Sequence, residues 1–233
     1  MKRGIKITVI SATFLMVAIC SVQAEIDWDF YEDGTIDPGD EYWNVGVYDT
    51  PPDHTTVDMT GGLVDSMGAY DESTVNMTGG TVNTLRSANL STVNVSGGSV
   101  YSLKAWDTGT VRVWGNADVF ALSALDSGVV NMWEGQADHV GAGEFGTVNL
   151  SGGLVTDYLG ASGSGLINIY GYDLEKFSSG GKYGDGFVSG VWQDDITFNF
   201  DFYGSGTYSR VALIPEPCTL CLLGLGALLA RAC

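Results

Sequence analysis

Apolar and polar positions between residues 55 and 170 follow one pattern that recurs about every eighteen residues. Each copy opens on a β-branched anchor, and successive anchors are 18 or 19 residues apart. The anchors are Val57, Val75, Val93, Val111, Val130, Val148 and Ile167. A nearly constant period over seven copies is typical of a solenoid rather than of an ordinary globular domain.

Each copy contains two short apolar patterns separated by glycine. In the second copy, Val75 and Met77 alternate with polar residues, which predicts a strand. Gly79-Gly80 follows, and glycine accepts the positive φ angles that a tight corner requires. Val82 and Leu85 then begin a second strand. No copy has the apolar spacing of a helix, so the pattern predicts an all-β, parallel β-solenoid (β-helix) of about seven coils of 18–19 residues.

Stacked coils would place equivalent residues in columns along the solenoid axis, and four of these columns are apolar. The anchors form the first column. The second contains Met59, Met77, Val95, Val113, Met132, Leu150 and Ile169. The third contains Val64, Val82, Val100, Val119, Ala137 and Val155. The fourth contains Met67, Leu85, Leu103, Leu122, Val140 and Tyr158. We expect these columns to form the core.

Two segments flank the repeats. Residues 25–54 hold ten acidic residues and no lysine or arginine, and we expect an N-terminal cap with a strand over 44–48. Residues 171–213 begin glycine-rich and polar, and then Ile196, Phe198, Phe200 and Phe202 alternate with polar residues. This alternation predicts a small C-terminal β module, similar to a hairpin, that covers the last coil.

The charge of the chain restricts its partners. Its composition is 45% hydrophobic with 33 glycines and 5 prolines, which suits a core with many tight corners. The formal net charge is −18, and removal of Lys2, Arg3 and Lys6 with a signal peptide leaves 7 basic and 28 acidic residues, or −21. So negative a surface argues against nucleic acid and anionic lipid as partners, whereas cations remain compatible with it.

Residues 1–24 have the features of a secretory signal peptide. Lys2, Arg3 and Lys6 form a basic start, an apolar run follows, and Ala24 is a small residue at the expected cleavage point. We therefore expect an exported protein whose mature chain begins at Glu25.

The chain ends in a second targeting pattern. Ile214-Pro215-Glu216-Pro217 precedes the apolar run Cys218–Ala230, and Arg231 follows it. Over residues 214–233 this arrangement resembles the PEP-CTERM sorting signal of exported bacterial proteins. The repeats resemble passenger repeats of bacterial surface β-helix proteins.

The sorting-signal resemblance implies a partner and a location. In that family a membrane protease-transpeptidase, exosortase, reads the tail, and its substrates are associated with exopolysaccharide and biofilm matrix. Pro215, Glu216, Pro217 and Arg231 would then direct sorting and processing. The apolar run has thirteen residues, fewer than the ~20 that a permanent membrane helix needs. We expect transient membrane association at the C-terminus, followed by a cell-surface or extracellular location.

The chemistry-bearing residues do not form a recognisable catalytic set. His54 and His139 lack the ligand spacing of a zinc site, and the chain has no nucleophile elbow, P-loop or dinucleotide fingerprint. We therefore expect a non-catalytic protein that needs no cofactor, with calcium as the one alternative. A polysaccharide lyase or hydrolase would have only Asp107 and Asp126 as paired carboxylates.

Two surface columns are candidate sites. One corner aligns Asp71, Asp107, Asp126 and Glu144, together with Asn89. These carboxylates would either bind calcium between coils or simply favour the turn through local hydrogen bonds, and the turn explanation is the simpler one.

The second column places Trp114 and Trp133 on successive coils, with Arg112 nearby and Tyr170 further along. Adjacent exposed aromatic rings stack on sugars, but they also serve to pack under a terminal module. The sequence thus favours a secreted structural protein of the cell surface or exopolysaccharide matrix. A polysaccharide-binding module is the alternative, and a lyase or hydrolase ranks third.

Overall fold

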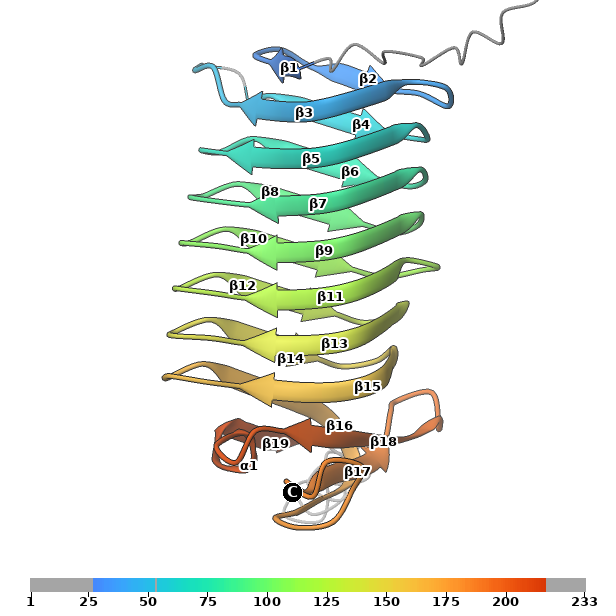
Figure 1. The fold of residues 1–233 in the computed structure, drawn as a ribbon, viewed down its shortest axis with the longest axis vertical. Coiled ribbons are helices and arrows are strands. Elements are labelled where there is room, and N and C mark those ends of the chain that lie inside the picture. The colour runs from blue at the N-terminus through green and yellow to red at the C-terminus, as the bar shows by residue number, and fades with distance from the viewer. Residues whose placement is uncertain (1–26, 53, 217–233) are drawn as a thin grey trace, which may run out of the picture.

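The chain forms a parallel β-solenoid of about eight turns, which Figure 1 shows as a vertical stack. The computed structural model describes residues 27–52 and 54–216. Each regular turn contains one short strand, a glycine corner, one long strand and a second corner. The strands stack into two sheets, which we call the short sheet and the long sheet. The predicted fold class is confirmed.

The bounds of the strands follow the sequence repeat. The short sheet contains β2 (Gly34–Ile36), β4 (Thr56–Met59), β6 (Thr74–Met77), β8 (Thr92–Val95), β10 (Thr110–Val113), β12 (Val129–Met132) and β14 (Thr147–Leu150). The long sheet contains β3 (Glu41–Tyr48), β5 (Leu63–Tyr70), β7 (Thr81–Ser87), β9 (Ser99–Ala105), β11 (Asp118–Ala124), β13 (Gln136–Ala142) and β15 (Leu154–Ala161).

Each strand pairs in parallel with the equivalent strand of the next turn. Val75 lies opposite Val93, and Val93 lies opposite Val111, so the anchors form a single column. The glycine corner makes this close stacking possible in two ways. Gly98 has a φ of +83°, whereas a methyl group at Gly97 would lie 2.5 Å from the Thr78 carbonyl oxygen of the previous turn.

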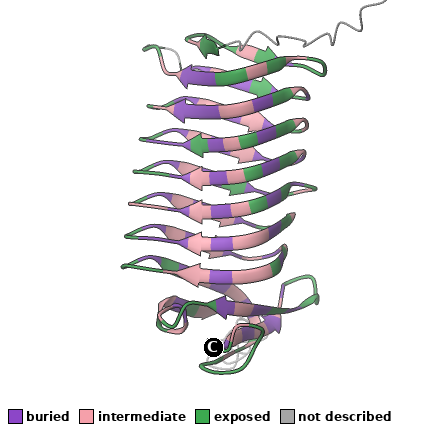
Figure 2. Cartoon of the chain, viewed as in Figure 1, coloured by how far each residue is buried: buried purple, intermediate pink, exposed green. Residues whose placement is uncertain are grey.

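The core lies between the two sheets and contains the four predicted columns with one correction. Figure 2 shows buried positions recurring at the same places along the stacked strands. In β15, Leu159 is fully buried and continues the fourth column, while Tyr158 is only half-buried and lies opposite His139. The prediction for Tyr158 was wrong because β15 carries one extra residue, a bulge that shifts the register.

Small residues form a fifth buried column that the apolar pattern did not predict. It lies at the end of each long strand, where the chain turns toward the short sheet. Its members are Ala69, Ser87, Ala105, Ala124 and Ala142. Four of the five are alanines, and the hydroxyl of the fifth, Ser87, donates a hydrogen bond to the Ser91 carbonyl oxygen at 2.8 Å.

The acidic N-terminal segment continues the solenoid. Its strands β2 and β3 pair in parallel with β4 and β5, and β1 (Asp27–Phe30) pairs with the outer edge of β3. The strand expected over residues 44–48 lies within β3. These residues therefore add a turn of the same architecture and do not lie across the end of the first repeat.

The C-terminal segment closes the other end with antiparallel strands. Its elements are β16 (Leu166–Phe177), β17 (Phe187–Val191), β18 (Thr197–Tyr203), the short helix α1 (Thr207–Arg210) and β19 (Val211–Pro215). β17 is antiparallel to β16 and β18, whereas β18 and β19 pair in parallel with β15 and β16. The phenylalanines of β18 are buried as expected. Ile196 is exposed, because it lies in the turn before β18, where its carbonyl oxygen accepts a hydrogen bond from the Trp192 amide.

The two predicted targeting segments fall largely outside the described part of the chain. The signal peptide, Pro217, the apolar run and Arg231 all lie beyond it. Within residues 27–52 and 54–216, no helix combines the length and apolar character needed to cross a bilayer.

Candidate functional site

The acidic corner column consists of turn residues with left-handed backbone conformations. The φ angles of Asp71, Asn89, Asp107, Asp126 and Glu144 lie between +52° and +57°. Asp and Asn adopt this conformation more readily than most residues, which accounts for their recurrence at this corner. A hydrogen bond with Asp126 and repulsion from its carboxylate raise the pKa of Glu144. Calcium binding in this column stays a prediction.

The structure brings only part of the predicted aromatic face together. Trp114 and Trp133 are adjacent and exposed, with ring centroids 6.4 Å apart and ring planes at 67°. Tyr170 lies two turns further along, with Ser151 between it and Trp133 in the same column. The two indoles meet edge to face, so they do not offer one flat surface to a sugar ring.

Arg112 belongs to a polar ladder on the outer face of the short sheet. Its guanidinium lies 3.5 Å from the Asn94 side-chain oxygen, and the Asn94 amide donates to Asn76 at 2.8 Å. The Asn168 amide donates to Asn149, and the Asn149 amide donates to Asn131, each at 2.9 Å. This repeated asparagine therefore ties successive turns together through side-chain hydrogen bonds.

A second aromatic column runs along the outer face of the long sheet, and the sequence analysis missed it. Tyr101 and Phe120 stack with centroids 4.7 Å apart and planes at only 5°. Phe120 then contacts His139 edge to face, and His139 stacks on Tyr158 at 4.5 Å. Tyr158 contacts Tyr203 of β18 at 4.9 Å. We call these five residues the aromatic ladder.

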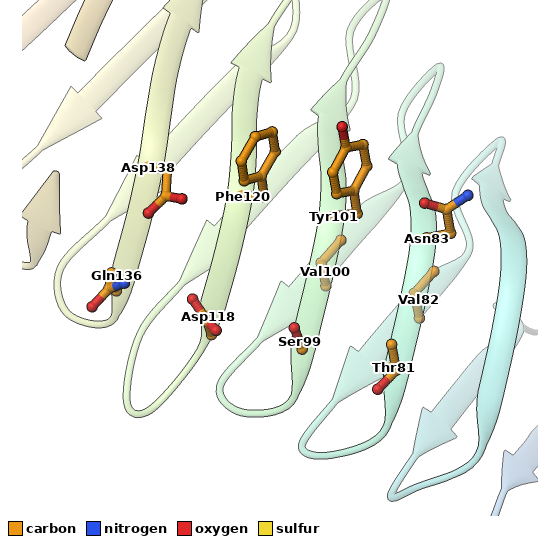
Figure 3. A pocket seen from close by; sticks show the side chains of 10 residues that line it. All are labelled: Thr81, Val82, Asn83, Ser99, Val100, Tyr101, Asp118, Phe120, Gln136 and Asp138. Carbon is orange, nitrogen blue, oxygen red and sulfur yellow. The ribbon is translucent and has the colours of Figure 1, made fainter. Parts of the chain in front are cut away.

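The start of the aromatic ladder lines a groove with polar walls. Figure 3 shows Tyr101 and Phe120 side by side on β9 and β11, with polar side chains around them. The groove encloses about 320 Å³. Its polar lining residues are Thr81, Asn83, Ser99, Asp118, Gln136 and Asp138. Tyr101 is 57% and Phe120 38% exposed, so this stacked pair is accessible from solvent.

The signal for this groove was present in the repeat. Tyr101 and Phe120 each follow a third-column valine, at a position that Asp65, Asn83 and Asp138 occupy in other copies. Two large aromatic residues at an outward polar position of successive turns form an exposed apolar patch that the repeat pattern alone does not require.

The loop between β16 and β17 packs against the far end of the aromatic ladder through Tyr183. Asp157 accepts hydrogen bonds from the Lys182 ammonium group, from the Tyr183 hydroxyl at 2.6 Å, and from His139, whose Nε2 is 2.9 Å away. These donors, Lys182 first, lower the pKa of Asp157 to about 2. The same contact raises the pKa of Lys182 above its usual range. A charged cluster thus fixes this loop to the long sheet.

The Pro-Glu-Pro sequence of the predicted sorting signal begins at the end of β19. Pro215 is the last residue of β19 and lies opposite Gly171 of β16. The Glu216 amide donates a hydrogen bond to the Gly171 carbonyl oxygen at 3.1 Å. Pro217 and Arg231, the other two residues predicted to direct sorting, lie outside the described residues.

Comparison with protein-family models, curated proteins and solved structures found no match to the chain. The class of protein that the fold defines is the parallel β-solenoid.

Proposed function

We propose that this chain is an exported, non-catalytic structural protein of the cell surface or exopolysaccharide matrix. The observation that carries the proposal is the junction at Pro215, where the last parallel strand of the solenoid runs directly into the Pro-Glu-Pro sequence. A tail attached at that point can be read and removed by a membrane protease without loss of any strand.

The fold suits a structural role outside the cell. Each turn satisfies the backbone hydrogen bonds of its neighbours, and each adds residues to one continuous core. The polar ladder on the short sheet adds further hydrogen bonds between turns. Such a rod depends on no disulfide within the described residues, so its stability does not depend on the redox conditions of its compartment.

A chain that stops after Glu216 tests the role of the tail. The truncated protein keeps β19, so its melting temperature should equal that of the solenoid in the full chain within about 2 °C. In the native host, the full chain should pass through a membrane-associated precursor, whereas the truncated chain should be exported without one. Identical processing of the two chains would contradict sorting through the tail.

A second candidate function is polysaccharide binding, and the Tyr101–Phe120 pair favours it. The stacked rings expose apolar edges that are bordered by amides and hydroxyls, which suits contact with the apolar faces and hydroxyl edges of a sugar chain. The carboxylates of Asp118 and Asp138 would repel polyanions, so the fitting ligand is a neutral polysaccharide.

Affinity electrophoresis in gels containing neutral glucans distinguishes the two aromatic surfaces. If the groove binds glucan, Tyr101→Ala should weaken retardation at least about tenfold through loss of apolar contact with the sugar. Trp114→Ala, on the short-sheet side, is the matched control and should leave it unchanged. Retardation that is lost with Trp114→Ala and kept with Tyr101→Ala would contradict binding in the groove and assign the sugar-binding surface to Trp114 and Trp133.

A further inference from the structure

The corner between β3 and β4 differs from the corresponding corners of the repeats. It spans residues 49–55, seven residues between Tyr48 and Thr56, whereas the corner between β5 and β6 spans only residues 71–73. The additional residues include His54, one of two histidines in the chain. The register of the flanking strands is unchanged, since Tyr48 lies opposite Tyr70 and Thr56 opposite Thr74. The insertion therefore changes the corner without changing the solenoid.

This corner brings three potential metal ligands together from two consecutive turns. His54 Nδ1 lies 3.3 Å from Asp49 Oδ1 and 3.5 Å from Glu72 Oε2. One ligand atom from each residue lies within 4.8 Å of the other two. Asp49 and His54 come from the inserted corner, and Glu72 comes from the short corner of the following turn.

The three side chains differ in exposure in a way that suits an ordered but accessible site. The Asp49 side chain is only 7% exposed, and its Oδ1 accepts a hydrogen bond from the Thr55 amide at 3.3 Å. The side chains of His54 and Glu72 are 60% and 54% exposed. One ligand is thus held in place by the fold, while the other two face solvent and leave room for a water molecule to complete a coordination shell.

The distances from His54 Nδ1 to the Asp49 and Glu72 carboxylate oxygens match those between atoms that bind one metal ion. Both exceed the 2.7–3.2 Å typical of a direct N–H···O bond, and one imidazole nitrogen cannot donate well to two carboxylates at once. In a tetrahedral site with bonds of about 2.1 Å, ligand atoms lie about 3.4 Å apart. The observed 3.3 and 3.5 Å bracket that value.

The donor set indicates which ions would fit. One imidazole nitrogen and two carboxylate oxygens suit Zn²⁺ and similar first-row divalent ions, whereas Ca²⁺ and Mg²⁺ prefer sites made only of oxygen. The excess of acidic residues over the whole chain would also raise the local concentration of any cation.

We propose that Asp49, His54 and Glu72 form a binding site for a first-row divalent metal ion, with Zn²⁺ as its representative. The ion joins the inserted corner to the next turn. It therefore strengthens the N-terminal end of the solenoid, where the outer strands have fewer neighbours than those in the middle. This site is independent of the proposed function, and it lies apart from the acidic corner column, although Glu72 directly follows Asp71 of that column.

Calorimetric titration of the chelator-treated chain with Zn²⁺ tests the site. One ion should bind per chain, and the melting temperature should rise with Zn²⁺ concentration because the ion binds the folded state. Bound Co²⁺ should show the intense visible absorption of a four-coordinate ion. His54→Asn should weaken Zn²⁺ binding at least tenfold, and Ca²⁺ should not compete at equal concentration.

Two further variants serve as controls. Glu72→Gln removes an exposed ligand without disturbing the core, so it should also weaken binding even if variants of the buried Asp49 fail to fold. His139→Asn changes the other histidine, which pairs with Asp157, and should keep wild-type Zn²⁺ affinity. The proposal is overturned if Zn²⁺ does not bind, or if it binds His54→Asn and Glu72→Gln as tightly as the unaltered chain.

Discussion

At the residue scale, neighbouring positions on a short strand differ sharply in the substitutions that they tolerate. Val93 is fully buried between the two sheets, whereas Asn94 faces outward in the polar ladder. Val93→Asp places an unpaired charge in the core and should cost roughly 3 kcal/mol or more of unfolding free energy.

Asn94→Asp is the matched change on the outer face. It removes the hydrogen bond to Asn76 but places a carboxylate beside Arg112, so the net cost should stay below about 1 kcal/mol. Urea unfolding of both variants measures the difference. Similar losses of stability would contradict the assignment of inward and outward positions.

At the element scale, the loop between β16 and β17 is held on the long sheet by Asp157. Its carboxyl has a pKa of about 2 in the folded protein, against an ordinary value of 3.8. A lowered pKa stabilises the fold above pH ~4, and that contribution is lost as the pH falls toward 2. Solvent screening limits it to about 1 kcal/mol.

The Asp157→Asn variant should therefore be less stable than the unaltered chain at pH 6, and the difference should disappear near pH 2. Melting curves at several pH values measure it. A difference that stays constant from pH 6 to pH 2 would show that the Asp157 charge does not hold the loop.

The sequence predicted the repeating elements well because one period sets both register and core. Anchors such as Val75 and Val93 must stack if each copy forms one turn, and they do. Positions that break the period were harder to predict from the sequence. The bulge before Tyr158 adds one residue without a sequence marker, and its effect appears only when β15 pairs with β13.

The sequence pattern did not predict the N-terminal turn or the geometry of the candidate sites, for related reasons. Residues 34–48 form a turn of the solenoid but lack the Gly-Gly corner that marks the repeats. Trp114 and Trp133 were correctly placed on adjacent turns, yet the angle between their rings depends on side-chain packing. The grouping of Asp49, His54 and Glu72 depends on how an inserted corner folds over the next turn, and spacing along the chain cannot show that.

At the scale of the whole molecule, the described residues form a rod, and the predicted signal peptide and apolar tail lie outside them. Strand pairing runs from β1 to β19 and is parallel except at β17, and among the described residues Pro215 is the last one in a strand. The predicted signal peptide and the apolar tail flank this rod. The proposed function requires both to be removed during export, leaving the solenoid intact at the cell surface or in the matrix.

The most direct test of this account is the intact mass of the protein isolated from its native host. The account predicts a mature chain that begins at Glu25 and lacks the residues after about Pro217, because cleavage there leaves β19 complete. A product that still carries residues 220–233 would contradict sorting through the tail.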